Sequence, residues 1–205
     1  MKAELVKGTP EKITFTITDA TPSYMNALRR LATKEVPVMA IDDVEMKKNS
    51  SILYDEIIAH RVGLLALTTD LKGYQLLPVD HKGDEFVNNA MVKFVLSAKG
   101  PGTVYAKDLK SKDPAIKPVY PKTPIVKLLD DQELQFEAIA ILGKGKTHAK
   151  WDSGLAWYTQ QGTTYTFTLE SWGQLPAKDI LLAALKMFDE QLDTVIELSK
   201  DLDKE

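Results

Sequence analysis

One short segment of the chain has the residue types of a phosphate-binding loop. Residues 145–147 are Gly-Lys-Thr and follow the apolar run 139–142, so they match the end of the pattern G-x-x-x-x-G-K-[ST]. The first glycine of that pattern would fall at Ala140, although such loops need glycines so that backbone N–H groups can surround phosphate. We therefore favour a basic surface loop. The alternative is a stand-alone nucleotide-binding enzyme that uses the region from Lys144 to Lys150.

Other groups suited to catalysis are scarce. The chain has no cysteine, which excludes disulfides, thiolate nucleophiles, zinc ribbons and cysteine-held iron–sulfur clusters. His60, His81 and His148 are far apart in the sequence, and none has a second ligand type at metal spacing. The acidic pairs 42–43 and 130–131 are adjacent residues, which point to opposite faces of a strand and so form no catalytic dyad by themselves. The sequence predicts no catalytic, metal-binding or cofactor-binding residue.

The composition is that of a globular protein. Apolar residues make up 44% of the 205 positions and charged residues 27%, which argues against intrinsic disorder. The net charge of −3 provides no overall basic field that would attract nucleic acid. No run approaches the roughly 20 apolar residues of a membrane-spanning helix, and the first residues lack the apolar core of a signal peptide. A cytoplasmic protein without membrane contact is expected.

A helix near the N-terminus is the first element that could position functional side chains. Thr21 is a suitable cap and Pro22 a suitable first residue, because the N–H that proline lacks is unpaired there in any case. The helix ends near residues 36–37, where a proline pushes the preceding residue out of the helical region. Arg29 and Arg30 form either a solvated face or an interface, since arginine is favoured in partly desolvated ion pairs. The apolar residues at helical spacing are Met25, Leu28, Leu31 and Ala32.

A second, longer amphipathic helix is predicted over residues 176–202. Its length of about 26 residues exceeds the 11–12 residues typical of helices in compact domains. A stripe of this kind can pack inside its own domain or against another chain, and the length favours the second possibility. The apolar stripe follows a 4,3,4,3 spacing at Leu181, Leu185, Phe188, Leu192 and Val195.

The segment 99–127 is unusual in composition. It holds five of the ten prolines and seven lysines against two aspartates. We expect a long, mobile, basic excursion rather than packed structure. Its charge is either solvated, which we favour, or in contact with nucleic acid or an acidic partner.

The order of the elements predicts an α+β fold. Alternating or continuous apolar residues predict five strands, and a short helix is expected over 53–63. The first and last segments are expected to pack together as one discontinuous domain of residues 1–46 and 160–205, a sheet with two amphipathic helices. Residues 47–159 would form an inserted, mostly-β second domain. The predicted strands are 13–18, 38–46, 86–97, 132–142 and 164–170.

Three stretches of the chain occur together in one protein family. The first is YMNALRR at 24–30, followed by EVPVMAIDDVE at 35–45; the second is NSSILYDE at 49–56, followed by AHRVGLL at 59–65; the third is GKGKTHAKW at 143–151. In this order and spacing they resemble the family of the D subunit of archaeal RNA polymerase. That family is the counterpart of the N-terminal domain of the bacterial α subunit and of the third-largest eukaryotic subunit. The resemblance spans most of residues 10–200.

The resemblance implies a non-catalytic assembly subunit of DNA-directed RNA polymerase, a nucleotidyltransferase whose chemistry belongs to the large subunits. The discontinuous domain would be a dimerisation domain that pairs with subunit L, and the heterodimer would hold the large B subunit and the small subunits N and P. Nucleic acid would be met only through the assembled enzyme. His60, Arg61 and Gly63 would lie near the surface that meets a large subunit. The implied partner interface consists of Met25, Asn26, Leu28, Arg29, Arg30, Leu31, Leu181, Leu185, Phe188, Leu192 and Val195.

The chain also departs from the family pattern. Many members carry a cysteine-rich domain that binds an iron–sulfur cluster after the H-A-K-W stretch. Here residues 158–162 run directly into the next strand, so that domain and its cofactor are expected to be absent. Ala66 stands where the family often has proline, which affects the local loop. Nothing like the bacterial DNA-binding C-terminal domain is expected after the long helix.

Overall fold

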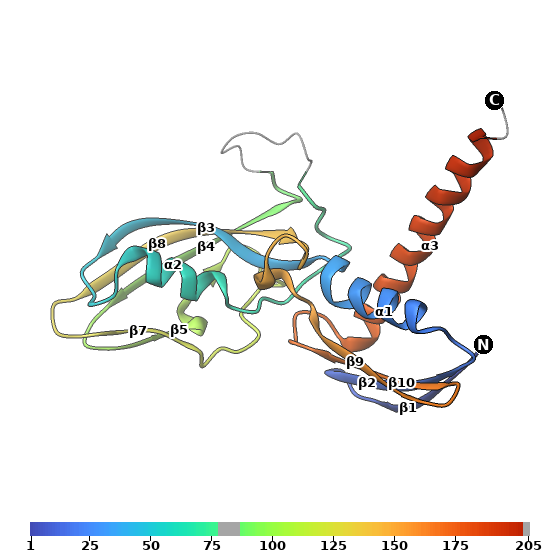
Figure 1. The fold of residues 1–205 in the computed structure, drawn as a ribbon. Coiled ribbons are helices and arrows are strands. Elements are labelled where there is room, and N and C mark those ends of the chain that lie inside the picture. The colour runs from blue at the N-terminus through green and yellow to red at the C-terminus, as the bar shows by residue number, and fades with distance from the viewer. Residues whose placement is uncertain (78–86, 203–205) are drawn as a thin grey trace. The chain divides into compact units, whose positions relative to one another are not determined.

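The computed structural model describes residues 1–77 and 87–202, without the side chains of the last two. The chain divides into two compact units (Figure 1). The terminal unit consists of Met1–Val36 and Asp152–Glu205, and the central unit of Pro37–Trp151. The combination of sheets and helices confirms the predicted α+β class. The boundaries expected at 46/47 and 159/160 lie inside strands β3 (Val38–Asn49) and β9 (Gly154–Gln161), and each strand belongs whole to one unit.

The terminal unit is built on a four-stranded antiparallel sheet of order β1-β2-β10-β9. The sheet comprises β1 (Lys2–Gly8), β2 (Lys12–Thr18), β9 and β10 (Thr164–Ser171). The predicted strands 13–18 and 164–170 are confirmed in β2 and β10, and their apolar side chains lie buried on one face because the side-chain period of a strand is two. Strands β1 and β9 were not predicted. The buried residues of β2 and β10 include Phe15, Ile17, Tyr165, Phe167 and Leu169.

Two helices cover the apolar face of this sheet, as Figure 1 shows. Helix α1 (Pro22–Arg30) begins at the predicted cap, where the Thr21 hydroxyl accepts the N–H of Tyr24 at 3.2 Å. A π-helical turn, η1 (Leu31–Glu35), continues it up to Val36. Helix α3 (Ala177–Leu202) confirms the long C-terminal helix. Its first turns pack on β2 and β10, and its later turns extend beyond the sheet (Figure 1).

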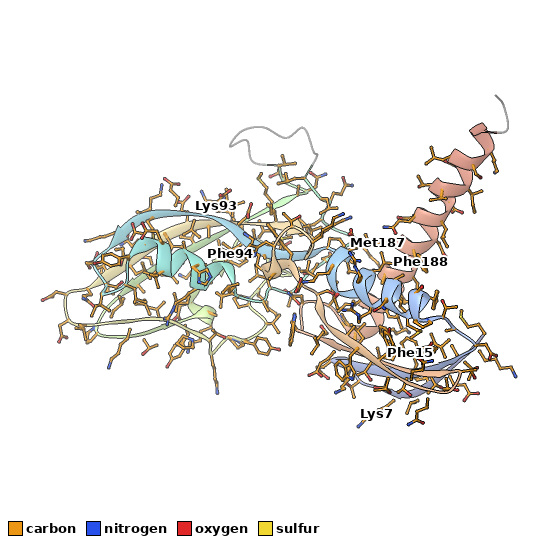
Figure 2. The ribbon with its side chains drawn as sticks, in the orientation of Figure 1. Lys7, Phe15, Lys93, Phe94, Met187 and Phe188 are labelled. Atoms are coloured by element: carbon orange, nitrogen blue, oxygen red, sulfur yellow. The ribbon has the colours of Figure 1, made fainter. Side chains whose placement is uncertain are left out.

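The central unit has a larger sheet of order β3-β8-β4-β6 and a smaller pair, β5 with β7. Helix α2 (Asp55–Gly63) and this pair lie on one side of the larger sheet (Figure 1). The core lies between them, and the alternation of buried and less buried residues along β8 and most of β4 separates it from the charged outer face. On β4, Phe94 is fully buried in the core, whereas the neighbouring Lys93 points to the other side of the sheet (Figure 2). The Lys93 ammonium pairs with the carboxylate of Glu137. The remaining strands are β4 (Met91–Lys99), β5 (Gly102–Tyr105), β6 (Lys110–Ser111), β7 (Pro124–Leu128) and β8 (Glu133–Gly143).

The expectation that 99–127 is an unpacked excursion is wrong. The segment contains β5, a 3-10 turn η2 (Ala106–Asp108), β6 and most of β7, and with the end of β7 it supplies seven buried residues to the core of the central unit. Its prolines occupy positions that tolerate a missing N–H, such as Pro124 at the first residue of β7. The prediction gave weight to the many prolines and lysines of this segment and overlooked its regularly occurring apolar residues. The buried residues are Val104, Ala106, Leu109, Ile116, Ile125, Val126 and, at the end of β7, Leu128.

Candidate functional site

The terminal unit has an apolar groove of about 280 Å³ between its sheet and its helices. The pairing of β1 with β2 places Ala3 opposite Ile17 and Leu5 opposite Phe15, so all four side chains lie on the face that the helices cover. Leu5 is nevertheless 68% exposed, because β1 is an edge strand. We call this feature the apolar groove. Its lining residues are Met1, Ala3, Glu4, Leu5, Ile13, Phe15, Ile17, Tyr24, Leu28, Leu181 and Leu185.

The apolar stripe of α3 runs from this groove into solvent. Leu181 and Leu185 line the groove and are half-buried. Phe188, labelled in Figure 2, is also half-buried, and the centre of its ring lies 5.8 Å from the centre of the Tyr24 ring on α1. Beyond it, every residue from 191 to 200 is exposed. The stripe therefore has partners within the terminal unit over its first half only. The exposed apolar residues on its second half are Leu192 at 48%, Val195 at 63% and Ile196 at 50%.

The predicted interface residues of α1 and η1 divide into two groups. Met25 and Leu31 are 0% and 6% exposed, so they support the surface from inside the terminal unit. Leu28 is also buried but lines the apolar groove. The polar residues Asn26 and Arg30 are exposed, and the Nε of Arg29 donates to Asn26 Oδ1 at 3.5 Å. The polar side of α1 is thus the side available to another chain.

The central unit has a smaller and more polar hollow, of about 250 Å³, which we call the histidine pocket. It lies between β3, α2 and the segment 144–150, and so brings together parts of all three stretches that resemble the D-subunit family. Two of the three predicted contact residues, His60 and Gly63, line it. Arg61 does not; its Nη1 donates to the carbonyl of Ile125 at 2.6 Å and ties α2 to β7. The lining residues are Ile41, Asp42, Val44, Ala59, His60, Gly63, Leu64, His148 and Lys150.

A partly desolvated ion pair forms one wall of the histidine pocket. The Nζ of Lys150 donates to Asp42 Oδ1 at 2.5 Å and lies 4.2 Å from the centre of the Trp151 ring. Only 13% of the Lys150 side chain is exposed. The backbone N–H of Lys150 donates to Nδ1 of His148 at 3.0 Å, so neutral His148 carries its proton on Nε2. The pair and the imidazole are therefore held in fixed orientations.

Trp151 anchors the segment that carries these groups. Its indole N–H donates to the carbonyl of Ile141 at 3.3 Å, and its ring lies against the backbone of Gly143. A Cβ at position 143 would lie 2.3 Å from Cε2 of the ring, so only glycine permits this approach. The ring in turn supports Lys150.

The structure does not support the nucleotide-binding alternative. The N–H of Thr147 bonds to the carbonyl of Lys144 at 2.8 Å, which closes a tight turn. The helix that follows, η3 (Ala149–Trp151), has only three residues, whereas a phosphate-binding loop leads into a helix whose N-terminus binds the anion. Lys150 is already paired with Asp42.

The described residues contain no group of three or more histidine, aspartate or glutamate side chains that could hold a metal ion. His81 lies outside the described residues. Within the same part of the chain, no helix is both long enough and apolar enough to span a membrane.

Sequence reasoning missed several residues of both surfaces. The alternation of Ile13, Phe15 and Ile17 indicated a half-buried strand, but it could not show that part of this face remains open beside β1. The partners Asp42 and Lys150 are 108 positions apart. No spacing rule connects residues at that distance, and only their presence in the resembling stretches hinted at a shared site.

Comparison with known proteins agrees with the geometry. A model of the RNA polymerase Rpb3/RpoA insert domain matches residues 40–155. The chain is 44% identical over 158 residues to DNA-directed RNA polymerase subunit Rpo3 of Pyrococcus horikoshii, which is 77% of this chain and 59% of that protein. It is 42% identical over 154 residues to the subunit Rpo3 of Methanothermobacter thermautotrophicus, 74% of this chain and 58% of that protein. The matches thus span less than two thirds of these relatives.

Proposed function

Because the chain belongs to the RNA polymerase family that includes Rpb3, RpoA and archaeal Rpo3, we propose that it is the assembly subunit of an archaeal DNA-directed RNA polymerase. It forms a heterodimer with subunit L, and the heterodimer organises the large B subunit and the small subunits N and P in the cytoplasm. Nucleotidyl transfer belongs to the large subunits. The observation that carries this proposal is the stripe of α3, which continues from the apolar groove into solvent as Leu192, Val195 and Ile196.

Apolar surface of this kind is characteristic of a docking site. Leu192, Val195 and Ile196 are each about half exposed or more, and fully burying such a side chain contributes roughly 1.5–3 kcal/mol before entropy is counted. A partner helix laid along α3 would cover all three and reach the groove at Leu185. In this arrangement the terminal unit is the dimerisation domain.

The central unit supports contact with a large subunit. Helix α2 exposes Ile57 at 46%, and Leu64 at 52% follows its last turn, with Tyr54 at 79% just before its first. The histidine pocket lies next to Leu64. We place the contact with the large B subunit on this side of the unit, which agrees with the family role expected for His60 and Gly63.

Two neighbouring residues of similar shape allow a matched test of the α3 interface. Val195 lies in the apolar stripe, whereas Thr194 lies on another side of the helix and bonds to the carbonyl of Glu190 at 2.9 Å. Both are exposed, so neither substitution disturbs the core. Val195→Asp is expected to weaken binding of subunit L at least tenfold, because it leaves a charge in an apolar interface. Thr194→Asp is the control and should bind like the parent chain.

The measurement is co-expression with subunit L followed by size-exclusion chromatography and titration calorimetry. The proposal expects a 1:1 complex for the parent chain and for Thr194→Asp. Equal binding of Val195→Asp and Thr194→Asp would contradict the placement of the interface. A monodisperse monomer that does not bind subunit L would contradict the proposed function itself.

A further inference from the structure

The side chains that line the histidine pocket indicate which kind of chemical group could bind there. We propose that it receives an aspartate or glutamate side chain from the protein that docks on the central unit. This inference deepens the proposed function and rests on it, since it concerns how the assembly platform recognises a partner.

The pocket offers several side-chain hydrogen-bond donors. The Lys150 ammonium has three N–H groups, and Asp42 takes one of them at 2.5 Å. Nδ1 of His148 already accepts the N–H of Lys150, so the open nitrogen of that ring is a donor. His60 adds a second imidazole. The one carboxylate in the lining, Asp42, is engaged by Lys150, and a second carboxylate would satisfy the remaining donors with charge-assisted bonds.

The size of the pocket favours a side chain over a free ligand. Its volume of about 250 Å³ lies below the roughly 300–1,000 Å³ of small-molecule sites. Its surroundings favour a protein as the source, because exposed apolar residues flank it on and beside α2. Ile57, His60 and Leu64 lie at positions i, i+3 and i+7, which is one face of a helix. When a partner covers Ile57 and Leu64, it excludes water from His60 and strengthens the charged contact.

The absence of a side chain at Gly63 keeps the pocket open, and this provides a clean test. A Cβ at position 63 would meet only the carbonyl of Ile41, at an ordinary 3.6 Å. Alanine is also a better helix former than glycine. Gly63→Ala should therefore fold with an equal or higher Tm while it narrows the pocket. We expect the heterodimer with Gly63→Ala to bind the purified large B subunit about tenfold more weakly, which corresponds to one missing favourable contact.

Gly8→Ala is the matched control. Its new Cβ would lie 4.0 Å from a methyl group of Leu5, so the same chemical change is made in the terminal unit, which does not contain the pocket. Its affinity for the large B subunit should equal that of the parent chain. If Gly63→Ala also binds like the parent, the pocket is not occupied in the complex and the proposal is wrong.

Two substitutions at His60 test the charge of the occupant. His60 is exposed on α2, so it can be changed without disturbing the core. With an acidic occupant, His60→Lys binds the large B subunit as tightly as the parent or more tightly, and His60→Asp binds at least tenfold more weakly. The opposite order would indicate a basic occupant, and equal weakening would indicate an uncharged one. Either result overturns the proposal.

These outcomes are separable from failure of the proposed function. Suppose that the parent heterodimer binds the large B subunit but the affinities of the two His60 variants do not follow the expected order. The proposed assembly role is then retained, and the proposal of an acidic occupant is wrong. If the parent heterodimer shows no affinity for the large B subunit, both are wrong. Titration calorimetry of the heterodimer with each variant gives all of these readings.

Discussion

The two candidate surfaces differ in the forces they can use. The apolar groove and the stripe of α3 present aliphatic and aromatic side chains, and Glu4 is the one charged side chain that lines the groove. The histidine pocket is compact and combines an ion pair and two imidazoles with four aliphatic residues, Ile41, Val44, Ala59 and Leu64. Burial of apolar surface is strong but non-directional, whereas charged hydrogen bonds select a partner by geometry and sign. Under the proposed function, the first surface would hold subunit L and the second would select the large B subunit.

The largest effect is expected from removing one buried ring in each unit. Phe167 on β10 and Phe94 on β4 are both 0% exposed, and truncating such a ring costs about 3–5 kcal/mol. Phe167→Ala should destabilise the terminal unit and abolish binding of subunit L, while Phe94→Ala should act on the central unit. Hydrogen exchange measured by mass spectrometry reports protection for each unit separately. If either variant lowers protection equally in both units, the two surfaces are not independent and the comparison fails.

A smaller effect is expected at Gly143. Gly143→Ala forces a Cβ into the ring of Trp151, and overpacking of this kind costs about 1–3 kcal/mol. Because Trp151 supports Lys150, binding of the large B subunit should be lost while binding of subunit L is kept. Urea unfolding and two calorimetric titrations measure this. Loss of both partners would show that the pocket and the groove are coupled.

Raising the salt concentration should weaken binding at the histidine pocket about tenfold relative to binding along α3. The screening length falls from about 10 Å at 0.1 M salt to about 3 Å at 1 M. Binding at the histidine pocket, which depends on charge, should weaken over this range. Binding of subunit L along α3 should stay constant or tighten. Titrations of both partners across the salt series check the difference, and parallel curves would remove the physical distinction between the surfaces.

The smallest effect is expected at a hydrogen bond that belongs to neither surface. The Tyr74 hydroxyl donates to Asp113 Oδ2 at 2.5 Å. Burial, together with this bond, raises the pKa of Tyr74 to about 12, and the bond lowers the pKa of Asp113. Tyr74→Phe should cost about 1 kcal/mol at neutral pH and leave binding of both partners unchanged.

The pH range of that contribution follows from the two pKa shifts. The pKa of Asp113 is lower in the folded state than in the unfolded state, where it is about 4. The ionised carboxylate therefore stabilises the folded state at pH values above about 4, and this stabilisation is lost as the pH falls below that value. The raised pKa of Tyr74 stabilises the folded state below its unfolded value of about 10, and the benefit is lost as the pH rises towards 12. The difference in urea midpoint between Tyr74→Phe and the parent should therefore be largest between these limits. A constant difference across the whole range would assign it to packing instead.

The sequence predicted those helices and strands whose caps or apolar alternation can be recognised from neighbouring residues alone. Thr21 and Pro22 marked the start of α1, and the threonine-alternating strands β2 and β10 were found at nearly their true bounds. Strand β1 gave no such signal because all seven of its residues are exposed. The segment 99–127 was misjudged because proline and lysine content was weighed above the spacing of its apolar residues.

The candidate sites were predictable only in part, for a different reason. The stripe of α3 is visible in the sequence because a helix repeats locally, and the structure adds which half of it is exposed. The histidine pocket depends on contacts between distant segments, such as Lys150 with Asp42. The resemblance of three stretches to one family pointed to His60 and Gly63, but neither spacing nor composition could place them beside the ion pair.

The order of strands in the terminal unit has a consequence for synthesis on the ribosome. Strand β2 pairs with β10, and their bonded residues Thr14 and Thr168 are 154 positions apart. The central unit is one continuous segment, Pro37–Trp151, so it can fold while its neighbour still lacks a strand. The β1–β2 hairpin must keep its apolar face open until β10 and then α3 emerge. The apolar groove is therefore complete only after β10 and the first turns of α3 have been synthesised, so a protein that docks in it has to wait for both.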